Sequence, residues 1–370
     1  MAADKFKGSL SAAAVGEALA RGIRAVCPTA DVDVLAVADG GEGTADVAAA
    51  AGFTVVVVTV CGPTLSSVDA AYLRSGDTGL IEVAAASGLA KLPGALAPMF
   101  ATSRGTGELI AHAARAGCRR IYLAAGGSAC TDGGAGMLHA LGAKILDDRG
   151  RAIGSGGGAE LLNVSTIDVS AIARLLGGCE VVLASDVDNP LVGPTGAAFV
   201  YSHQKGASAA QQRLLDEALT RWADVVYRAI GTDYRLAPGA GAAGGIGFAA
   251  LAALRANRIA GADMALGLLD FDNVIAGADL VITGEGSLDA QSLHGKAPVG
   301  VARRAGNQSI PVVAVCGRNG LTAAQAADAG FIATYALAEL EPDLSRSIAR
   351  AAQLLEATGR RIAREQLDQT

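Results

Sequence analysis

The sequence is poor in aromatic residues, and its cysteines and histidines show no regular spacing. Phe, Trp and Tyr make up 4% of the 370 residues, so the core must be built from Val, Leu, Ile and Ala in close backbone packing. The six cysteines include no CxxC pair, which argues against a zinc ribbon and a disulfide framework and favours reduced thiols. The four histidines lack the spacing of metal ligands.

An excess of positive charge and long apolar runs are also absent. The formal net charge of -6 argues against nucleic acid or an anionic membrane as the main partner. No signal peptide or lipidation motif is visible, and the most continuous apolar stretch, 242–254, is shorter than the roughly 20 residues of a membrane-spanning helix. We therefore expect a cytoplasmic protein with small-molecule partners. The sequence leaves the oligomeric state open, with a homodimer among the alternatives.

Glycine, in contrast, is abundant, with 49 residues, and it is concentrated in loops after predicted strands. The clearest example follows a short apolar run at 121–125 and precedes a helix pattern at 137–141. Its loop, 126–136, combines glycines with Ser128, Thr131 and Asp132. Glycines let the backbone approach a ligand closely, and a helix N-terminus attracts anions. The alternative interpretation is a tight turn between a strand and a helix without any ligand.

Three further loops follow predicted strands and carry both glycine and an acid, at 39–44, 185–193 and 283–291. Ligands bind at the carboxyl ends of strands in open α/β sheets. The four loops together therefore predict a site for phosphate and metal better than any one loop does. The Walker pattern is absent because Ala297 follows Lys296, and the protein-kinase and dinucleotide motifs are absent as well.

Hydrophobic periodicity predicts an α/β chain of about two domains. A helix is expected after Ser11, which suits an N-cap, with Val15, Leu19 and Ile23 on its apolar face. Strands are expected at 32–37, 53–60, 121–125, 181–184, 197–201, 278–283, 310–316 and 332–337, a hairpin at 68–83, and a long helix at 344–366.

Several segments resemble motifs of the bacterial type I glycerate kinases, in order and over nearly the whole chain. They are DKFKGSL (4–10), ADGGEGT (38–44), GGSACTDGGAGM (126–137), SDVDNPLVG (185–193), QKGA (204–207), PGAGAAGG (238–245), TGEGSLDAQ (283–291) and GKAPVGVA (295–302).

This resemblance implies an enzyme that uses ATP and Mg²⁺ to phosphorylate D-glycerate, giving 2-phosphoglycerate. It also implies two α/β domains with the active site in the cleft between them. The first is a Rossmann-like parallel-sheet domain formed by residues 1–65 and 275–370, and the second is a mixed α/β domain inserted at 66–274.

The sequence departs from the family pattern in two places. Family members begin with a short hydrophobic strand before the DKFKGS loop, whereas only Met1, Ala2 and Ala3 precede it here. We therefore expect the first strand to be missing, either because the start codon was placed too far downstream, which is the favoured explanation, or because the protein lacks this strand. The second departure is His203, which stands before Gln204 where the family usually has proline.

Phosphoryl transfer depends on positioning and charge neutralisation, so the charged loop residues are the candidates. Asp186 is expected to accept the proton of the reacting hydroxyl, and the other catalytic candidates, Lys5 and Lys7, suit the glycerate carboxylate. Substrate or phosphate contacts are expected from Ser9, Asp39, Gly40, Gly41, Glu42, Gly43, Thr44, Asn189, Lys205 and Lys296. Nucleotide contacts are expected from Gly126, Gly127, Ser128, Thr131, Asp132, Gly133, Gly239, Gly241, Gly244, Gly245, Gly284, Glu285 and Gly286. Metal ligands are expected among Asp39, Glu42, Glu285 and Asp289.

Each of these residues also has a purely structural interpretation. Acids favour turns and N-caps, lysines favour the solvated surface, and the glycines of 238–247 suit close helix packing. The choice between the 2- and the 3-hydroxyl of glycerate stays open, as does a related short hydroxy acid. A protein of another class, a ligand sensor that kept the fold without turnover, is the remaining alternative.

Overall fold

A computed structural model describes residues 1–6, 8–37, 44–153, 156–290, 292–294 and 296–367. The chain forms two compact units, 1–51 with 260–370 (unit 1) and 52–259 (unit 2). The sequence-based boundaries lay later, after residues 65 and 274. The difference arises because the strand at 54–61 pairs with the next strand of unit 2, and the helix at 261–268 packs within unit 1.

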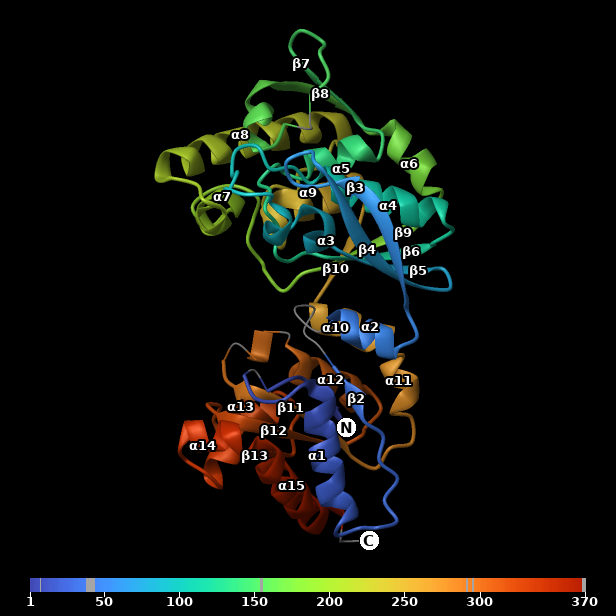
Figure 1. The fold of residues 1–370 in the computed structure, drawn as a ribbon, viewed down its shortest axis with the longest axis vertical. Helices are drawn as coiled ribbons and strands as arrows, with labels where there is room; N and C mark the ends of the chain where they lie inside the picture. The colour runs from blue at the N-terminus through green and yellow to red at the C-terminus, as the bar shows by residue number, and fades with distance from the viewer. Residues whose placement is uncertain (7, 38–43, 154–155, 291, 295, 368–370) are drawn as a thin grey trace. The chain divides into compact units, whose positions relative to one another are not determined.

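Unit 1 is built on a parallel sheet of five strands in the order β13-β12-β11-β1-β2 (Figure 1). The expected absence of the first strand is corrected by β1, a two-residue strand that pairs with β2 on one side and β11 on the other. The strands are β1 (Ala2–Ala3), β2 (Leu35–Ala36), β11 (Val281–Leu288), β12 (Val312–Asn319) and β13 (Ala333–Ala336).

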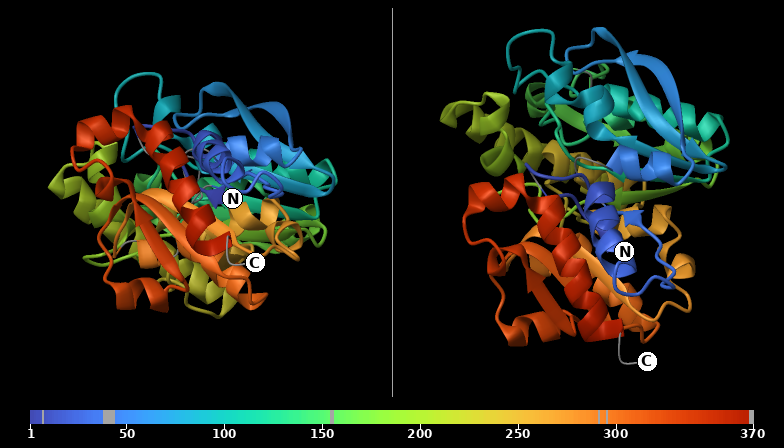
Figure 2. Two further views of the ribbon diagram at one scale, coloured as in Figure 1. Left: turned by 90° about the horizontal axis from the view of Figure 1, so that it is seen from below. Right: turned by 60° about the horizontal axis from the view of Figure 1, so that its bottom comes forward.

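Helices cover both faces of this sheet. One face carries α1 and α15, which lie side by side although they come from opposite ends of the chain (Figure 2). Gly22 and Gly359 permit this approach, because a Cβ atom at either position would overlap the backbone of the other helix. The opposite face carries α10 and α12. The helices of unit 1 are α1 (Ala12–Arg24), α2 (Thr44–Ala50), α10 (Gly261–Leu268), α11 (Phe271–Val274), α12 (Ala297–Asn307), α13 (Ala323–Asp328), α14 (Leu344–Ala349) and α15 (Ala351–Ile362).

The two ends of unit 1 show where local sequence rules succeed and fail. Ser11 caps α1 as predicted, since its Oγ accepts a hydrogen bond from the Ala14 N–H, and the predicted apolar face is buried. The predicted single helix over 344–366 is wrong. Arg350, with φ -110° and ψ 14°, interrupts it between α14 and α15, and the last turns, Ala363–Leu367, form a π-helix.

Unit 2 is built on a mixed sheet of six strands in the order β10-β9-β6-β5-β4-β3. Strands β3, β4 and β5 pair antiparallel, which confirms the predicted hairpin, and the remaining pairs are parallel. The α/β fold class is therefore confirmed. The strands are β3 (Thr54–Cys61), β4 (Ser67–Ser75), β5 (Thr78–Glu82), β6 (Arg120–Ala124), β9 (Glu180–Ala184) and β10 (Asn257–Ile259), with a separate hairpin of β7 (Lys144–Asp147) and β8 (Val164–Asp168).

The strand predicted at 197–201 is wrong, because this segment forms helix α7. Five apolar residues alone do not distinguish a strand from a buried helical turn. Here Ala197 and Ala198 are buried, whereas Val200 is exposed, and α7 packs against α8 and α9. The helices of unit 2 are α3 (Val83–Ser87), α4 (Arg104–Arg115), α5 (Ala135–Ala140), α6 (Ser170–Leu176), α7 (Ala197–Tyr201), α8 (Ala209–Ile230) and α9 (Ala242–Ala253).

Short 3-10 helices complete the description: η1 (Leu89–Lys91), η2 (Gly158–Asn163), η3 (His203–Lys205), η4 (Ser292–His294) and η5 (Leu337–Glu339). Within the described ranges, none of the helices has both the length and the apolar character needed to cross a membrane.

Candidate active site

A cavity of about 550 Å³ opens in unit 1 where strands β1, β11 and β12 end. The chain order of the sheet reverses at β1, and α/β sheets place ligands at such a switch point, outside the carboxyl ends of the strands. The loop after β1 contributes Asp4, Lys5 and Ser9, and Lys296 comes from the N-cap position of α12. The strand ends and the helices beyond them contribute Glu285, Gly286, Ser287, Gly317, Arg318, Leu337, Leu344, Ser347, Ile348 and Ala351, and Phe6 completes the lining.

Glu285 is the buried acid of this cavity. Sequence patterns predicted a loop from Gly284 onward, but β11 continues to Leu288, so Glu285 lies inside a strand with only 7% of its surface exposed. Its Oε2 is 3.3 Å from Nζ of Lys296, and its Oε1 has no hydrogen-bond partner among the described residues. Burial raises the pKa of this carboxyl, and the Ser292 side chain and then Lys296 oppose part of that shift.

The other predicted residues of unit 1 have varied surroundings. The Asp4 Oδ1 accepts a hydrogen bond from the Lys5 N–H at 2.6 Å, and the Ser9 hydroxyl donates to the main-chain oxygen of Ile348 at 3.1 Å. Thr44 is buried at the start of α2. Lys7, Asp39, Gly40, Gly41, Glu42 and Gly43 lie outside the described residues. The loop after β1 and the end of β11 are therefore the predicted segments that the structure brings together.

Arg318 is a cavity residue that the sequence analysis missed. It lies near the carboxyl end of β12, directly after Gly317. The loops predicted to form the site combine glycine with an acid after a strand, whereas Cys316-Gly317-Arg318-Asn319 combines glycine with a base. A basic residue next to glycine at the end of a predicted strand is the signal in the sequence that points to Arg318.

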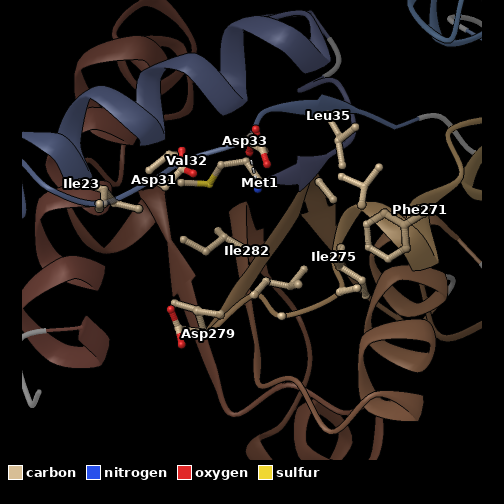
Figure 3. Close-up of a pocket in the computed structure, with 18 of the residues that line it drawn as sticks. Met1, Ile23, Asp31, Val32, Asp33, Leu35, Phe271, Ile275, Asp279 and Ile282 are labelled. Carbon is tan, nitrogen blue, oxygen red and sulfur yellow. Dashed lines mark hydrogen bonds between the residues drawn. The ribbon is translucent and has the colours of Figure 1, made fainter.

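A second cavity in unit 1, of about 370 Å³, lies at the opposite edge of the same sheet (Figure 3). Met1, Asp33 and Asp279 lie around it near the amino ends of the strands, and the Met1 amino group donates to the main-chain oxygen of Asp33 at 2.7 Å. Its lining includes no lysine or arginine side chain among the described residues. Among the described lining residues the Met1 amino group is the one basic group, and it is bonded to Asp33 and has its pKa lowered to about 6 by burial, so the cavity is a poor match for a phosphate or a carboxylate.

In unit 2, the predicted loop after β6 is organised around Asp132. This residue is 1% exposed, and its carboxylate accepts hydrogen bonds from both the N–H and the hydroxyl of Ser103 at 2.8 Å. It also accepts from the N–H groups of Gly134 and Gly136 at 3.1 and 3.2 Å. These bonds occupy both oxygens within the protein and favour the structural interpretation of Asp132.

Lys205 is buried as well, with 2% of its surface exposed. Its ammonium donates to the Ser128 hydroxyl at 3.0 Å and to the main-chain oxygen of Cys130 at 2.5 Å. Desolvation lowers the pKa of this lysine, while Asp132 opposes the shift. The same loop buries the Thr131 Oγ1, which has no partner among the described residues. Lys205 of the predicted motif at 204–207 therefore forms hydrogen bonds with the predicted motif at 126–137.

Most glycines of the two predicted nucleotide loops are explained by protein packing. A Cβ atom at Gly133 would overlap Trp222, and one at Gly244 would overlap the main-chain oxygen of Cys130. The loops also share a hydrogen bond from the Gly133 N–H to the Gly244 oxygen at 3.0 Å. Gly126 differs, because it is exposed and has no atom within 4 Å of a built Cβ. Gly127 is also exposed, and a Cβ atom there would have only Ala84 within 4 Å. A Cβ atom would lie too close to neighbouring atoms at the other predicted positions, which are Gly134, Gly239, Gly241, Gly245 and, in unit 1, Gly284.

Asp186, the residue predicted to accept the proton of the reacting hydroxyl, lies in the segment after β9. Asp186 is exposed, directly beyond the end of the strand. Asn189 holds the loop that follows, since its amide donates to the main-chain oxygen of Thr195 at 2.9 Å and accepts from the Tyr201 hydroxyl at 2.5 Å. Asp188 forms an ion pair with Arg258 at 2.7 Å. Of the acids here, Asp186 is the one presented at the strand end.

The described residues include no group of three or more His, Cys, Asp or Glu side chains that could hold a metal ion. Mg²⁺ needs only one or two carboxylates when phosphate oxygens and water complete its shell. The unpartnered Oε1 of Glu285 fits such a ligand, and Asp289 is half-buried four residues further on.

The sheet order and the charged cavity at its carboxyl edge are those of an α/β enzyme that binds a small anionic ligand. Comparison with known proteins shows to which family of α/β enzymes the chain belongs. The model of the glycerate kinase family matches residues 1–367, so the chain belongs to this family. It is accordingly a kinase, a phosphotransferase that acts on an alcohol group with ATP as phosphoryl donor.

Individual relatives agree with the family match. The chain is 42% identical over 367 residues to a glycerate kinase of Bacillus subtilis (strain 168), covering 98% of this chain and 96% of that one. It is 44% identical over 322 residues to a glycerate 2-kinase of Escherichia coli (strain K12), covering 86% and 84%. A crystal structure of a Salmonella typhimurium LT2 protein described as a glycerate kinase 2 superposes with a TM-score of 0.83 at 41% identity, covering 98% and 96%.

Proposed function

We propose that this protein transfers the γ-phosphoryl group of ATP to the 2-hydroxyl of D-glycerate, with Mg²⁺, and releases ADP and 2-phosphoglycerate. The hydroxyl oxygen forms a bond to the γ-phosphorus, the bond from that phosphorus to the bridging oxygen of ADP breaks, and the hydroxyl proton leaves. Family membership supports the reaction, and the relative named glycerate 2-kinase supports the choice of hydroxyl. The cavity that combines Glu285, Lys296 and Lys5 at the carboxyl edge of the sheet is the observation that carries the proposal.

The proposed roles in unit 1 follow from the charges of this cavity. Lys5 and Ser9, from the loop after β1, bind glycerate, and the DKFKGSL motif makes Lys7 a further candidate for the same role. Lys296 is positioned for a phosphate, since it occupies the N-cap position of α12, where the helix dipole adds positive potential. When bound, Mg²⁺ neutralises charge on the phosphates, and Glu285 would hold it through Oε1, with Asp289 as a second candidate.

The proposed roles in unit 2 follow from which residues of its loops are exposed to solvent. Asp186 accepts the proton of the reacting hydroxyl because it is exposed at the end of β9. Gly126 and Gly127 contact the nucleotide, because their backbone is exposed and Gly126 is free of packing contacts. Ser128, Thr131, Asp132 and Lys205 shape this loop from inside the protein.

The reaction is tested by incubating the purified protein with Mg-ATP and D-glycerate. ADP release is followed, and the product is identified by phosphorus NMR. A 2-phosphoglycerate signal supports the proposal, whereas a 3-phosphoglycerate signal keeps the kinase and overturns the choice of hydroxyl. Faster turnover of another short hydroxy acid would change the substrate. Binding of ATP and glycerate without any turnover would favour the sensor.

A matched pair of variants tests the proposed base. Asp186→Asn should lower kcat by at least ~100-fold while ATP binding, measured by calorimetry, is retained. Asp188→Asn is the control, because Asp188 lies on the same loop and its side chain pairs with Arg258. Unchanged turnover in Asp186→Asn would remove Asp186 from the mechanism.

A further inference from the structure

We propose that Arg318 binds the carboxylate of the acid substrate and so makes this kinase selective for hydroxy acids over neutral polyols. The inference rests on the proposed function and adds to it a residue that recognises the substrate. Arg318 lines the cavity at the end of β12, opposite Ser287 of β11 in the parallel register. Nothing in the proposed roles of Lys5, Lys296 or Glu285 requires this arginine.

The register of the sheet places Arg318 on the side of the cavity that also carries Glu285. Glu285 pairs with Cys316, and two residues further along each strand Ser287 pairs with Arg318. Side chains two residues apart on a strand point to the same face, so Glu285 and Arg318 are diagonal neighbours, offset by roughly 6.6 Å along the strands and about 4.8 Å across them. A three-carbon acid is short enough to lie along this distance with its carboxylate at Arg318.

Among the charged residues of the cavity, Arg318 is available to form an ion pair with a bound anion. Lys296 forms an ion pair with Glu285, whereas the guanidinium of Arg318 has no hydrogen bond or ion pair with any residue that the structure describes. The lining contains Lys5, Lys296 and Arg318 against Asp4 and Glu285, a formal surplus of one positive charge. A monoanionic carboxylate matches that surplus.

The chemistry of arginine fits this ligand better than that of lysine. Its planar guanidinium binds a carboxylate through two parallel hydrogen bonds, whereas an ammonium acts as a point charge. Arg318 is exposed at the cavity, so a soluble acid can reach its guanidinium, and Leu337, Leu344 and Ile348 add apolar surface to the same lining. The cavity volume of about 550 Å³ leaves room for a three-carbon acid and the phosphoryl group that it receives.

The test compares three variants with the wild-type protein. Arg318→Ala should weaken binding of D-glycerate, measured by calorimetry without ATP, by ~10- to 100-fold, and raise the KM for glycerate by a similar factor. Arg318→Lys should lose less, ~3- to 10-fold, because the charge remains. The KM for ATP should change by less than about twofold in both variants. Arg364→Ala is the control, since Arg364 is an exposed arginine of the same unit that lines neither of its described cavities.

The outcomes separate this inference from the proposed reaction. Unchanged glycerate binding in Arg318→Ala overturns it, and so does a raised KM for ATP with an unchanged KM for glycerate, which would assign Arg318 to the nucleotide phosphates. If the wild-type protein binds D-glycerate without turning it over, the reaction fails, but the calorimetric comparison still decides the role of Arg318. A wild-type protein that binds no D-glycerate overturns both. Circular dichroism of each variant excludes unfolding as the cause.

Discussion

The Nζ atom of Lys205 lies 2.5 Å from the main-chain oxygen of Cys130, although the two residues are 75 positions apart in the chain. The same ammonium donates to the hydroxyl of Ser128, and a Cβ atom added to Gly244 would lie 2.9 Å from it. Lys205, the last residue of η3, therefore lies where the loop after β6 meets residues 243–245 of α9, whose backbone is not helical. The lysine that the sequence predicts as a phosphate ligand forms a buried connection between loops in this structure.

Replacing this lysine should reduce stability. In Lys205→Met the aliphatic stem is kept, but the Ser128 hydroxyl and the Cys130 oxygen lose a charged donor, which should cost about 1–3 kcal/mol in the free energy of unfolding. Urea denaturation measures the change. Lys144→Met, at an exposed lysine of the same unit, is the control. A raised KM for ATP at unchanged stability would instead restore the phosphate-binding interpretation.

The carboxylate of Asp132 should also be required for folding stability. Asp132→Asn replaces one acceptor oxygen with a donor that faces the N–H groups of Ser103, Gly134 or Gly136, so at least one buried group loses its partner. We expect a loss of ~2 kcal/mol or more in the free energy of unfolding. Asp77→Asn, at an exposed aspartate of unit 2, should show little change. Equal stability of the two variants would contradict the structural role of Asp132.

These buried contacts mark the limit of what the sequence predicts. The apolar spacing of α1 and its Ser11 cap are local patterns, so helix and cap were predicted correctly. Lys205 and Ser128 are 77 positions apart, and no local pattern connects them. The sequence therefore predicted which loops carry polar residues, but not whether each polar group faces a ligand or the protein.

The end of β11 shows the same limit for secondary structure. Gly284 and Gly286 disfavour a strand, so a loop was expected there. Pairing with β12 overrides this preference as far as Leu288 and brings Glu285 into the sheet. Arg318 was missed for a related reason, since its importance depends on the strand beside it. Tertiary pairing, which local propensity does not contain, decides both cases.

Glycine substitutions can separate packing from ligand approach. Gly244→Ala should destabilise the protein by several kcal/mol, because its φ is +70° and the new Cβ would overlap the Cys130 oxygen. Gly231→Ala has a similar φ of +78° but no atom within 4 Å, so it should cost only ~1 kcal/mol. Gly126→Ala should leave the melting temperature unchanged and raise the KM for ATP. A Gly126 variant with normal ATP kinetics would argue against nucleotide contact at this position.

The β7–β8 hairpin should contribute a stability that depends on pH. Asp147 accepts hydrogen bonds from the N–H groups of Arg149 and Arg151, and the Arg151 N–H is the main reason why its pKa lies below the ordinary value of 3.8. A carboxyl with a lowered folded-state pKa stabilises the protein above its unfolded pKa and loses that contribution as the pH falls through the folded value. Asp147→Asn should therefore melt below the wild type at pH 7, and the difference should shrink as the pH is lowered from about 4. Asp148→Asn, at the exposed neighbouring residue, should show no such trend. A difference in melting temperature that stays constant with pH would show that the contribution of Asp147 does not depend on its charge.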